Sequence, residues 1–244
     1  RGNADRSYDG IIDEVRVSSA VRAQCYIQTE YNNINSPVTF YEVGTEEPLG
    51  FNYYKPLTIQ SSMMGTSCGT SGVTEFPLLI NLSGVTEIKT TTNGGHVYSS
   101  SGYDIIFKDA SGVKLDHEVE YYSGTSGDLV AWVRVPVISG TTNTSLSMYY
   151  GNSSVTSSTE NKAGVWNSNF VVVQHMHQAS ALALDDSTSH HNDVTAEVGD
   201  PAFQAAGKIG YSAELDGDDA VDIQDSASLD IATQVTLSAW IRPT

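Results

Sequence analysis

Asp13 is the residue whose type and position in the sequence most directly suggest chemistry. It lies in the strand-like run 11–17, where alternation puts its side chain on the same face as the apolar residues at positions 11, 15 and 17. That face is expected to form the core, and a buried carboxylate needs a cation or several N–H donors beside it. The run therefore predicts either a metal ligand or a carboxylate that pairs with Arg16, Arg22 or the amides of a loop.

Other polar clusters could also bind a metal ion or act on a substrate, but each has a plainer structural interpretation. The run 216–219 contains three aspartates, which suit a cation and are equally typical of a solvated hairpin turn. His175 and His177 share one side of a predicted strand without a third spaced ligand, which disfavours zinc. Glu118 and Glu120 are paired carboxylates at strand spacing, but no general acid accompanies them.

Signatures of the common catalytic sites are absent from the sequence. It contains no nucleophile elbow, no phosphate-binding loop and no cysteine–histidine nucleophile pattern. We therefore predict that the chain is not an enzyme.

The composition predicts a folded, strongly acidic protein. Its 244 residues are 39% hydrophobic and 17% charged, and a chain of this length can bury a sizeable core. The formal net charge of −17 repels phosphate backbones, which disfavours nucleic acid as a partner. The same charge suits divalent cations, or it serves solubility alone. No run approaches the about 18 apolar residues of a membrane span, so we expect no direct membrane insertion in this segment.

The two cysteines leave two interpretations open. Cys25 lies in a helix-like segment and Cys68 in the Gly-, Ser- and Thr-rich run 65–72, which is expected to be a loop. Disulfide geometry is strict and the sequence carries no information on the distance between them. A bridge is one interpretation, and two buried, unpaired thiols are the one that we favour.

Short strands joined by turns dominate the pattern and predict an all-β fold built as an antiparallel β-sandwich. One short helix is expected near 19–31, with Ser18 or Ser19 as its cap and the asparagines at 32 and 33 at its end. The predicted strands span residues 10–17, 39–44, 55–60, 76–82, 104–108, 113–122, 129–135, 144–150, 171–177, 211–215 and 235–241.

The middle of the chain, residues 51–165, closely resembles the bacterial family called domain of unknown function 2341. The matching pieces are residues 51–55, 75–80, 103–109, 115–121, 130–136 and 148–152. Phe51 stands where the family usually has tryptophan. The resemblance implies a β-sandwich that is commonly followed by a LamG-like domain in large bacterial surface or exported proteins. Some such proteins are fused to proton-channel subunits of the MotA/TolQ/ExbB type.

The flanking segments resemble parts of LamG-like (concanavalin A-like) jelly rolls. Residues 1–47 are similar to the end of such a domain, through the strand 8–17 and the helix after it, and 48–50 are expected to be a linker. Residues 170–244 are similar to its start, through the runs 185–194, 207–219 and 237–244, although Ser189 and Val194 replace expected glycines. The two segments could pair within the chain, between neighbouring chains, or with strands of a longer parent. We favour the first two, because unpaired sheet edges invite association.

The LamG resemblance also implies a structural calcium ion. Many such domains hold calcium between the loop near their start and the strand near their end. Carried over to this sequence, the ligands are Asp13, Asp186 and Asn192, with backbone carbonyls near Ser189 and His191. Calcium takes about six to eight oxygens, and the plainer alternative is that no metal binds.

Three functions remain open. The leading prediction is a non-enzymatic structural or adhesive module of a large secreted or surface bacterial protein, a repeat unit of a fibre or stalk whose terminal strands pair with copies of itself. The first alternative is a carbohydrate-binding accessory region of a secreted enzyme or adhesin, because 13 tyrosines and the three tryptophans Trp132, Trp166 and Trp240 could stack on glycans. The second alternative is the exported sensing portion of a proton-channel fusion. All three place the chain outside the cell, at the cell surface or in the periplasm.

Overall fold

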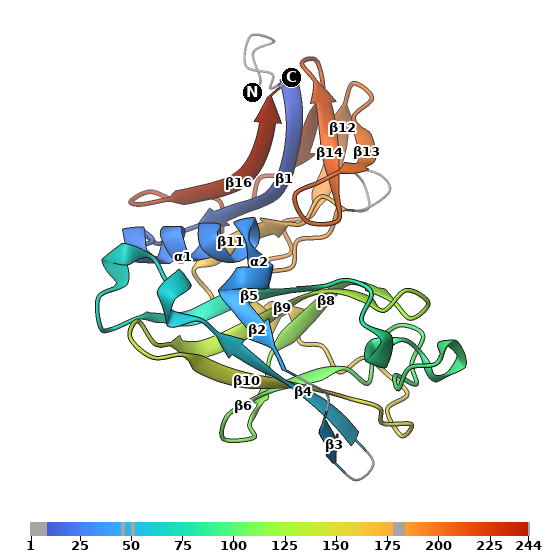
Figure 1. Ribbon diagram of the computed structural model, residues 1–244. Helices are drawn as coiled ribbons and strands as arrows, with labels where there is room; N and C mark the ends of the chain where they lie inside the picture. Colours follow the sequence, from blue (N-terminus) through green and yellow to red (C-terminus); the bar gives the residue numbers. More distant parts are fainter. Residues whose placement is uncertain (1–8, 45–46, 50–51, 178–183, 244) are drawn as a thin grey trace. The chain divides into compact units, whose positions relative to one another are not determined.

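The computed structural model describes residues 9–44, 47–49, 52–177 and 184–243 (Figure 1). The chain divides into two compact units: residues 1–22 with 166–244, here called the split unit, and residues 23–165, the middle unit. Both are built mainly from antiparallel strands, which confirms the predicted all-β fold. The division differs from the expected segments, because the helix that we assigned to residues 1–47 belongs to the middle unit.

The middle unit contains two antiparallel sheets. One has the strand order β2-β4-β10-β6-β7 with β3 added to β4, and the other has the order β5-β9-β8. The strands are β2 Tyr41–Val43, β3 Glu47–Leu49, β4 Asn52–Ile59, β5 Val73–Leu82, β6 Ile106–Asp109, β7 Lys114–Leu115, β8 His117–Ser123, β9 Asp128–Ile138 and β10 Thr144–Tyr150. Two residues of the predicted linker, 48 and 49, therefore belong to a strand that pairs with β4.

Alternation along the strands of the middle unit separates buried from less buried side chains. Leu57 and Ile59 on β4, and Met148 and Tyr150 on β10, are fully or almost fully buried. Their neighbours at every second position are more exposed, as expected for a sheet with one face in a core. On β5 the whole run 76–80 is buried, so this strand is covered on both faces.

Helix α1, Gln24–Asn35, covers the outer edge of β5. The side chain of Asn33 accepts a hydrogen bond from the Leu79 amide (2.7 Å) and donates one to the Leu79 carbonyl (3.2 Å). Asn81 lies two residues after Leu79 on β5. The Tyr41 hydroxyl accepts a hydrogen bond from the Asn81 amide (2.8 Å) and donates one to the Asn81 carbonyl (2.9 Å). These side chains replace a neighbouring strand, so they close an edge that could otherwise pair with another chain.

The predicted helix exists, but its bounds were wrong at both ends. It begins at Gln24, and its N-cap residue, Ala23, offers no side-chain hydrogen bond. Ser18 ends strand β1 and so cannot serve as the cap. The asparagines at 32 and 33 stay inside the helix because their side chains bond other parts of the fold, Asn32 donating to the Met63 carbonyl at 2.7 Å. A second short helix, α2 Pro37–Phe40, follows.

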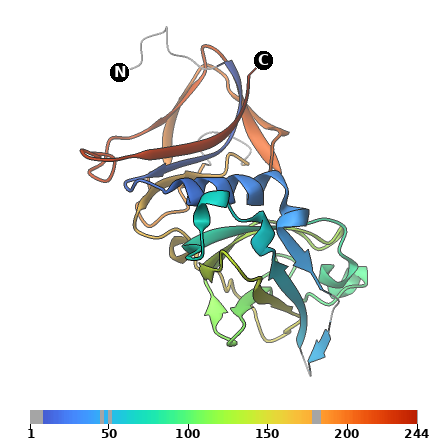
Figure 2. The same ribbon diagram turned by 60° about the vertical axis from the view of Figure 1, so that its left-hand side comes forward.

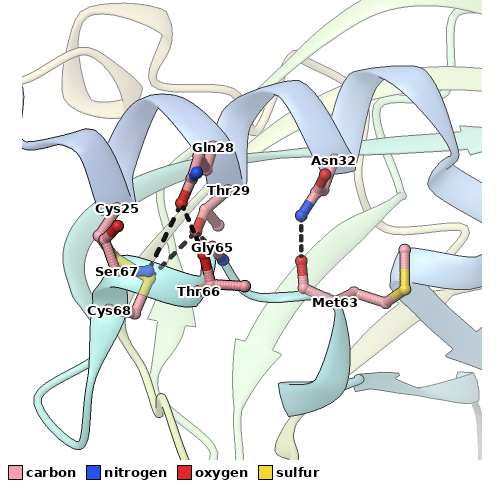
Figure 3. The surroundings of a disulfide bond; sticks show 9 residues. All are labelled: Cys25, Gln28, Thr29, Asn32, Met63, Gly65, Thr66, Ser67 and Cys68. Carbon is pink, nitrogen blue, oxygen red and sulfur yellow. Dashed lines mark hydrogen bonds between the residues drawn. A yellow bond between two sulfur atoms is a disulfide. The ribbon is translucent and has the colours of Figure 1, made fainter.

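A disulfide joins Cys25 on α1 to Cys68, which corrects the favoured prediction of two unpaired thiols (Figure 3). The Cα atoms lie 4.6 Å apart, a separation that the sequence could not reveal. Thr29, one helical turn after Cys25, accepts a hydrogen bond from the Gly65 amide at 3.0 Å. The loop that carries Cys68 is thus fixed to α1 by both a covalent bond and hydrogen bonds.

The split unit is organised around β1, Asp9–Ser18. Along one side, β1 pairs antiparallel with β16, Thr236–Pro243, and along the other with β14, Tyr211–Asp216, and then β11, Phe170–Gln174. Figures 1 and 2 both show β1 and β16 side by side. Strands from the two ends of the chain therefore pair within one chain, as in the first of the predicted arrangements.

The split unit is completed by three short strands that the sequence analysis did not predict. These are β12 Val194–Val198, β13 Ala202–Ala206 and β15 Ala220–Ile223. β13 extends the main sheet beyond β14, while β12 and β15 form a separate pair. A small core contains Met176, Leu184, Val194 and Ala213, with Ile12, Val15, Phe203, Val221 and Ile223 packed against it.

A β-bulge in β1 changes which side chains face that core. Asp13 lies opposite Trp240, but Arg16 lies opposite Ser238, so β1 has one extra residue at this point. Glu14, within the bulge, adopts a positive φ of 53°. Ile12 and Val15 consequently both pack on the core, whereas Asp13 points to the opposite face of the sheet. The prediction that Asp13 shares a face with residues 15 and 17 was therefore wrong, because simple alternation does not continue through a bulge.

Across the described part of the chain, every helix is too short or too polar to cross a lipid bilayer.

Candidate binding site beside Asp13

Asp13 is buried, and only one of its carboxylate oxygens is hydrogen-bonded. The side chain is 1% exposed, and its Oδ2 accepts hydrogen bonds from the amides of Lys208 (2.8 Å) and Ile209 (3.1 Å). A Cβ atom at Gly207 would lie 2.8 Å from Oδ2, so glycine allows the loop to approach this closely. Oδ1 is also buried, yet it accepts no hydrogen bond from the residues that the structure describes. An orphan oxygen of this kind is uncommon and calls for a ligand, a water molecule or a proton.

Burial raises the pKa of Asp13 to about 7, and the nearby Glu14 carboxylate acts in the same direction. Hydrogen bonds from the amides of Ile209, Lys208 and Glu14 lower the pKa, but by less than burial raises it. Near neutral pH this carboxyl group therefore exists in both protonation states, which is unusual for an aspartate.

A cavity of about 220 Å³ lies beside Asp13. Its lining consists of Ile11, Asp13, Ala206, Gly207, Lys208, Trp240, Ile241 and Arg242. The strand register explains why these side chains gather: Trp240 lies directly opposite Asp13, and Arg242 lies opposite Ile11, so all four project from one face of the sheet. The Lys208 ammonium lies over the indole of Trp240, 5.0 Å from the ring centroid, so a cation–π contact holds it at the cavity wall.

The neighbouring residue Glu14 belongs to a separate buried ionic network. Its carboxylate accepts from Arg16 Nη2 at 2.8 Å and lies 3.1 Å from Nδ1 of His175. The Arg16 guanidinium lies over the ring of Trp166, 5.1 Å from its centroid. A buried charge of this kind is tolerated because it is paired and hydrogen-bonded. His175 is thus a packed, hydrogen-bonded histidine.

Asp186 and Asn192, the other proposed calcium ligands, are joined to each other by a hydrogen bond. Oδ1 of Asp186 accepts from the amides of Val173 (2.9 Å) and Thr188 (3.0 Å), and Oδ2 accepts from the Thr188 hydroxyl (2.6 Å) and the Asn192 amide (2.9 Å). Oδ1 of Asn192 accepts from the hydroxyl of Ser226 at 2.7 Å. Protein donors therefore bond both side chains, and no contact among the described residues links either of them to Asp13. Calcium binding stays a prediction.

The aspartates of the run 216–219 form a turn between β14 and β15. The Asp219 carboxylate accepts from the amides of Asp200 (2.8 Å) and Asp216 (3.0 Å). Carboxylate oxygens of Asp216, Asp218 and Asp219 lie within 4.8 Å of one another, although acidic groups on a turn commonly cluster without a metal. The hydrogen bonds favour a turn, but β14 and β15 belong to different sheets and Asp219 is buried, so the turn is not the solvated hairpin that the sequence predicted.

Glu118, Glu120 and two of the three tryptophans have structural roles in their own units. Glu118 is 2% exposed and lies 3.8 Å from the Lys162 ammonium, and Glu120 accepts from Trp132 Nε1 at 2.8 Å. Trp132 and Trp166 are buried, so they cannot form an exposed platform for a glycan. Trp240, which is partly exposed, is the tryptophan that lines the cavity.

Sequence reasoning did not identify Lys208 or Arg242 as site residues. A signal was present, because they are the only lysine and the only arginine in the run 166–244. The pairing of β1 with β16 places both residues beside Asp13. These two strands are separated by more than 200 residues of sequence, and the sequence analysis expected the terminal segments to pair but could not give the register.

Comparison with known proteins bears on the middle of the chain. A model of the family described as domain of unknown function (DUF2341) matches residues 101–191, which is less than half of the chain. The match supports the predicted family for the middle domain and continues into β11 and the loop that carries Asp186. It does not reach residues 9–22 or 194–243, for which the LamG resemblance stays a prediction. Searches of curated proteins and of solved structures found no match.

Proposed function

We propose that this chain is a non-enzymatic structural module of a large secreted or surface-displayed protein, in which copies associate through strand β16. The observation that carries the proposal is the open edge of β16. Among the described strands it pairs only with β1. Leu237 is 70% exposed and Ile241 is 56% exposed, although they lie on the face that β1 uses for the core. An exposed apolar edge strand is a template for pairing with another chain.

A second copy of the same chain is the occupant that the sequence of β16 favours. Leu237 and Ile241 lie two residues on either side of Ala239. Antiparallel pairing of two β16 strands centred on Ala239 brings Leu237 of each copy opposite Ile241 of the other. Such a contact is self-complementary, as a two-fold interface requires.

Two further features support a specific role for β16 and an exported location. The side chains of Asn33 and Tyr41 close the outer edge of β5. The edge of β5 is therefore protected from pairing with another chain, in contrast to the edge of β16. The disulfide between Cys25 and Cys68 is stable in an oxidising compartment, such as the periplasm or the cell exterior, and is uncommon in the cytosol.

Light scattering at increasing protein concentration tests the proposal. The wild-type chain is expected to form dimers or larger assemblies, and Leu237→Lys is expected to remain monomeric, because a charge at an edge disrupts pairing. Val137→Lys is the matched control, since Val137 is 53% exposed but lies outside β16, on β9 of the middle unit, where it pairs with Thr74 of β5. A wild-type chain that stays monomeric throughout, or a control that dissociates as readily as Leu237→Lys, contradicts the proposal.

A further inference from the structure

The sequence contains a single Asp–Pro peptide bond, between Asp200 and Pro201. It lies in the short connection between β12 and β13, where Asp200 is exposed and Pro201 is partly exposed. The carboxylate of Asp200 forms no hydrogen bond or ion pair with any residue that the structure describes. This carboxylate can therefore turn toward the main-chain carbonyl group of its own residue.

The main chain of the same connection is held in place by Asp219, which is 5% exposed. Oδ1 of Asp219 accepts a hydrogen bond from the Asp200 amide at 2.8 Å, and Oδ2 accepts one from the Asp216 amide at 3.0 Å. Gly199 adopts a positive φ of 73°, and a Cβ atom there would clash with Oδ1 of Asp219. The Asp200–Pro201 bond thus combines a fixed main chain with an unbonded carboxylate.

We propose that the Asp200–Pro201 bond is a self-cleavage site. A carboxyl oxygen of Asp200 attacks the main-chain carbonyl carbon of the same residue and forms a five-membered cyclic anhydride. The bond from this carbon to the nitrogen of Pro201 breaks, and the nitrogen takes the proton that the carboxyl group gives up. One water molecule then opens the anhydride, which leaves a C-terminal Asp200 with two free carboxyl groups and an N-terminal Pro201.

Three properties make this bond more susceptible than the other peptide bonds of the chain. The amide nitrogen of proline is tertiary and leaves as a secondary amine, which is more basic than the primary amine that other residues release. The nucleophile belongs to the residue that is cleaved, so its effective concentration is high. Fixing the main chain through Asp219 removes part of the entropy that ring closure costs in an unfolded chain.

The cleaved protein is expected to stay assembled. Strands β14 and β16, which follow the bond, pair with β1, and β15 pairs with β12. Residues 201–244 would therefore remain bound through strand pairing after their covalent link to the preceding chain is lost. The inference goes beyond the proposed structural role, because it adds a processing step that does not depend on association through β16.

Incubation of the purified chain at a pH of about 4.5 tests the proposal, because the attacking carboxyl group must carry the proton that leaves with the nitrogen. Denaturing electrophoresis and mass spectrometry then identify the fragments. We expect one fragment that ends at Asp200 and one that begins at Pro201. The same chain unfolded in urea measures the intrinsic lability of the bond, and the folded chain is expected to be cleaved about tenfold faster.

Four variants separate the groups that take part. Asp200→Ala removes the nucleophile and Pro201→Ala replaces the tertiary amide, so each is expected to abolish cleavage. Asp219→Ala is expected to slow cleavage to the rate in urea, and Asp219→Asn, which keeps an acceptor for the Asp200 amide, is expected to restore it. Asp218→Ala is the matched control, since it removes a neighbouring exposed carboxylate and is expected to have no effect.

The comparison between folded and unfolded wild-type chain decides the proposal even if a variant does not fold. An intact folded chain, cleavage at another bond, or an equal rate in urea overturns it. An Asp218→Ala variant that is slowed as much as Asp219→Ala overturns the positioning role of Asp219.

Discussion

Asp13 is expected to make the stability of the split unit depend on pH, and Asp13→Asn is expected to remove that dependence. The pKa of the group rises from its ordinary value of 3.8 to about 7 on folding, chiefly through burial. At pH values between 3.8 and about 7, the folded state binds more protons at this group than the unfolded state does. The free energy of unfolding therefore falls as pH rises through this range. At 1.36 kcal/mol for each pH unit between the two pKa values, the ionised group costs about 4 kcal/mol above pH 7. Asparagine keeps the shape and the acceptor for the two loop amides but carries no charge.

Urea unfolding at about pH 4.5 and pH 8, in chelator, measures this effect through the difference between wild type and Asp13→Asn. The compared quantity is the free energy of unfolding of Asp13→Asn minus that of wild type. It is expected to be larger at pH 8 than at pH 4.5 by roughly 3–4 kcal/mol. Using the difference removes the pH dependence of the other acidic groups, which is large in a chain of net charge −17. A difference that is the same at both pH values would refute the assigned burial of Asp13.

Asp128 provides a control of opposite sign in the middle unit. Hydrogen bonds from the Ser126 hydroxyl and the Gly84 amide lower the pKa of Asp128. Its contribution to stability is therefore present above the ordinary pKa of an aspartate and is lost as pH falls. Asp128→Asn is expected to be more destabilising at pH 8 than at low pH, which is the reverse of the result for Asp13→Asn.

Three further predictions concern the disulfide, the closed edge of β5 and calcium. Cys68→Ser is expected to lower the stability of the middle unit by about 4 kcal/mol, which is the loop-entropy value for a disulfide with a sequence separation of 43 residues. Urea unfolding measures this loss, and an unchanged unfolding midpoint contradicts the prediction. Asn33→Ala leaves the Leu79 amide without its partner and is expected to cost about 1–3 kcal/mol and to promote aggregation, which turbidity measures; a soluble variant of normal stability argues against edge closure. If calcium binds as the LamG resemblance implies, chelator lowers the melting temperature, and an unchanged melting temperature rules out that structural role.

The sequence was most informative where periodicity and burial agree. The strand predicted at 144–150 has the bounds of β10, and the strand 10–17 differs from β1 by one residue at each end. β10 alternates in the way that one buried face requires, whereas the alternation of β1 is interrupted by the bulge at Glu14. The strands at 194–198, 202–206 and 220–223 were not predicted, because their short runs of alanine and acidic residues carry little apolar pattern.

The candidate site depended on features that no local pattern carries. Burial of Asp13 was predicted, but its face was not, because the bulge at Glu14 shifts the alternation by one residue. Lys208 and Arg242 reach the site through long-range pairing, whose register is set by the folded sheet. The approach of Cys25 to Cys68 likewise follows from how α1 lies on β5. Spacing in sequence cannot specify contacts of this kind.

Hydrogen–deuterium exchange of the β16 amides at several protein concentrations tests the central claim most directly. In a dilute sample, the amides of Thr236–Pro243 that point away from β1 are expected to exchange rapidly, because no described strand pairs with that edge. At high concentration the same amides are expected to become protected, while protection along β5 stays constant. Protection of β16 that does not depend on concentration would contradict association through this strand.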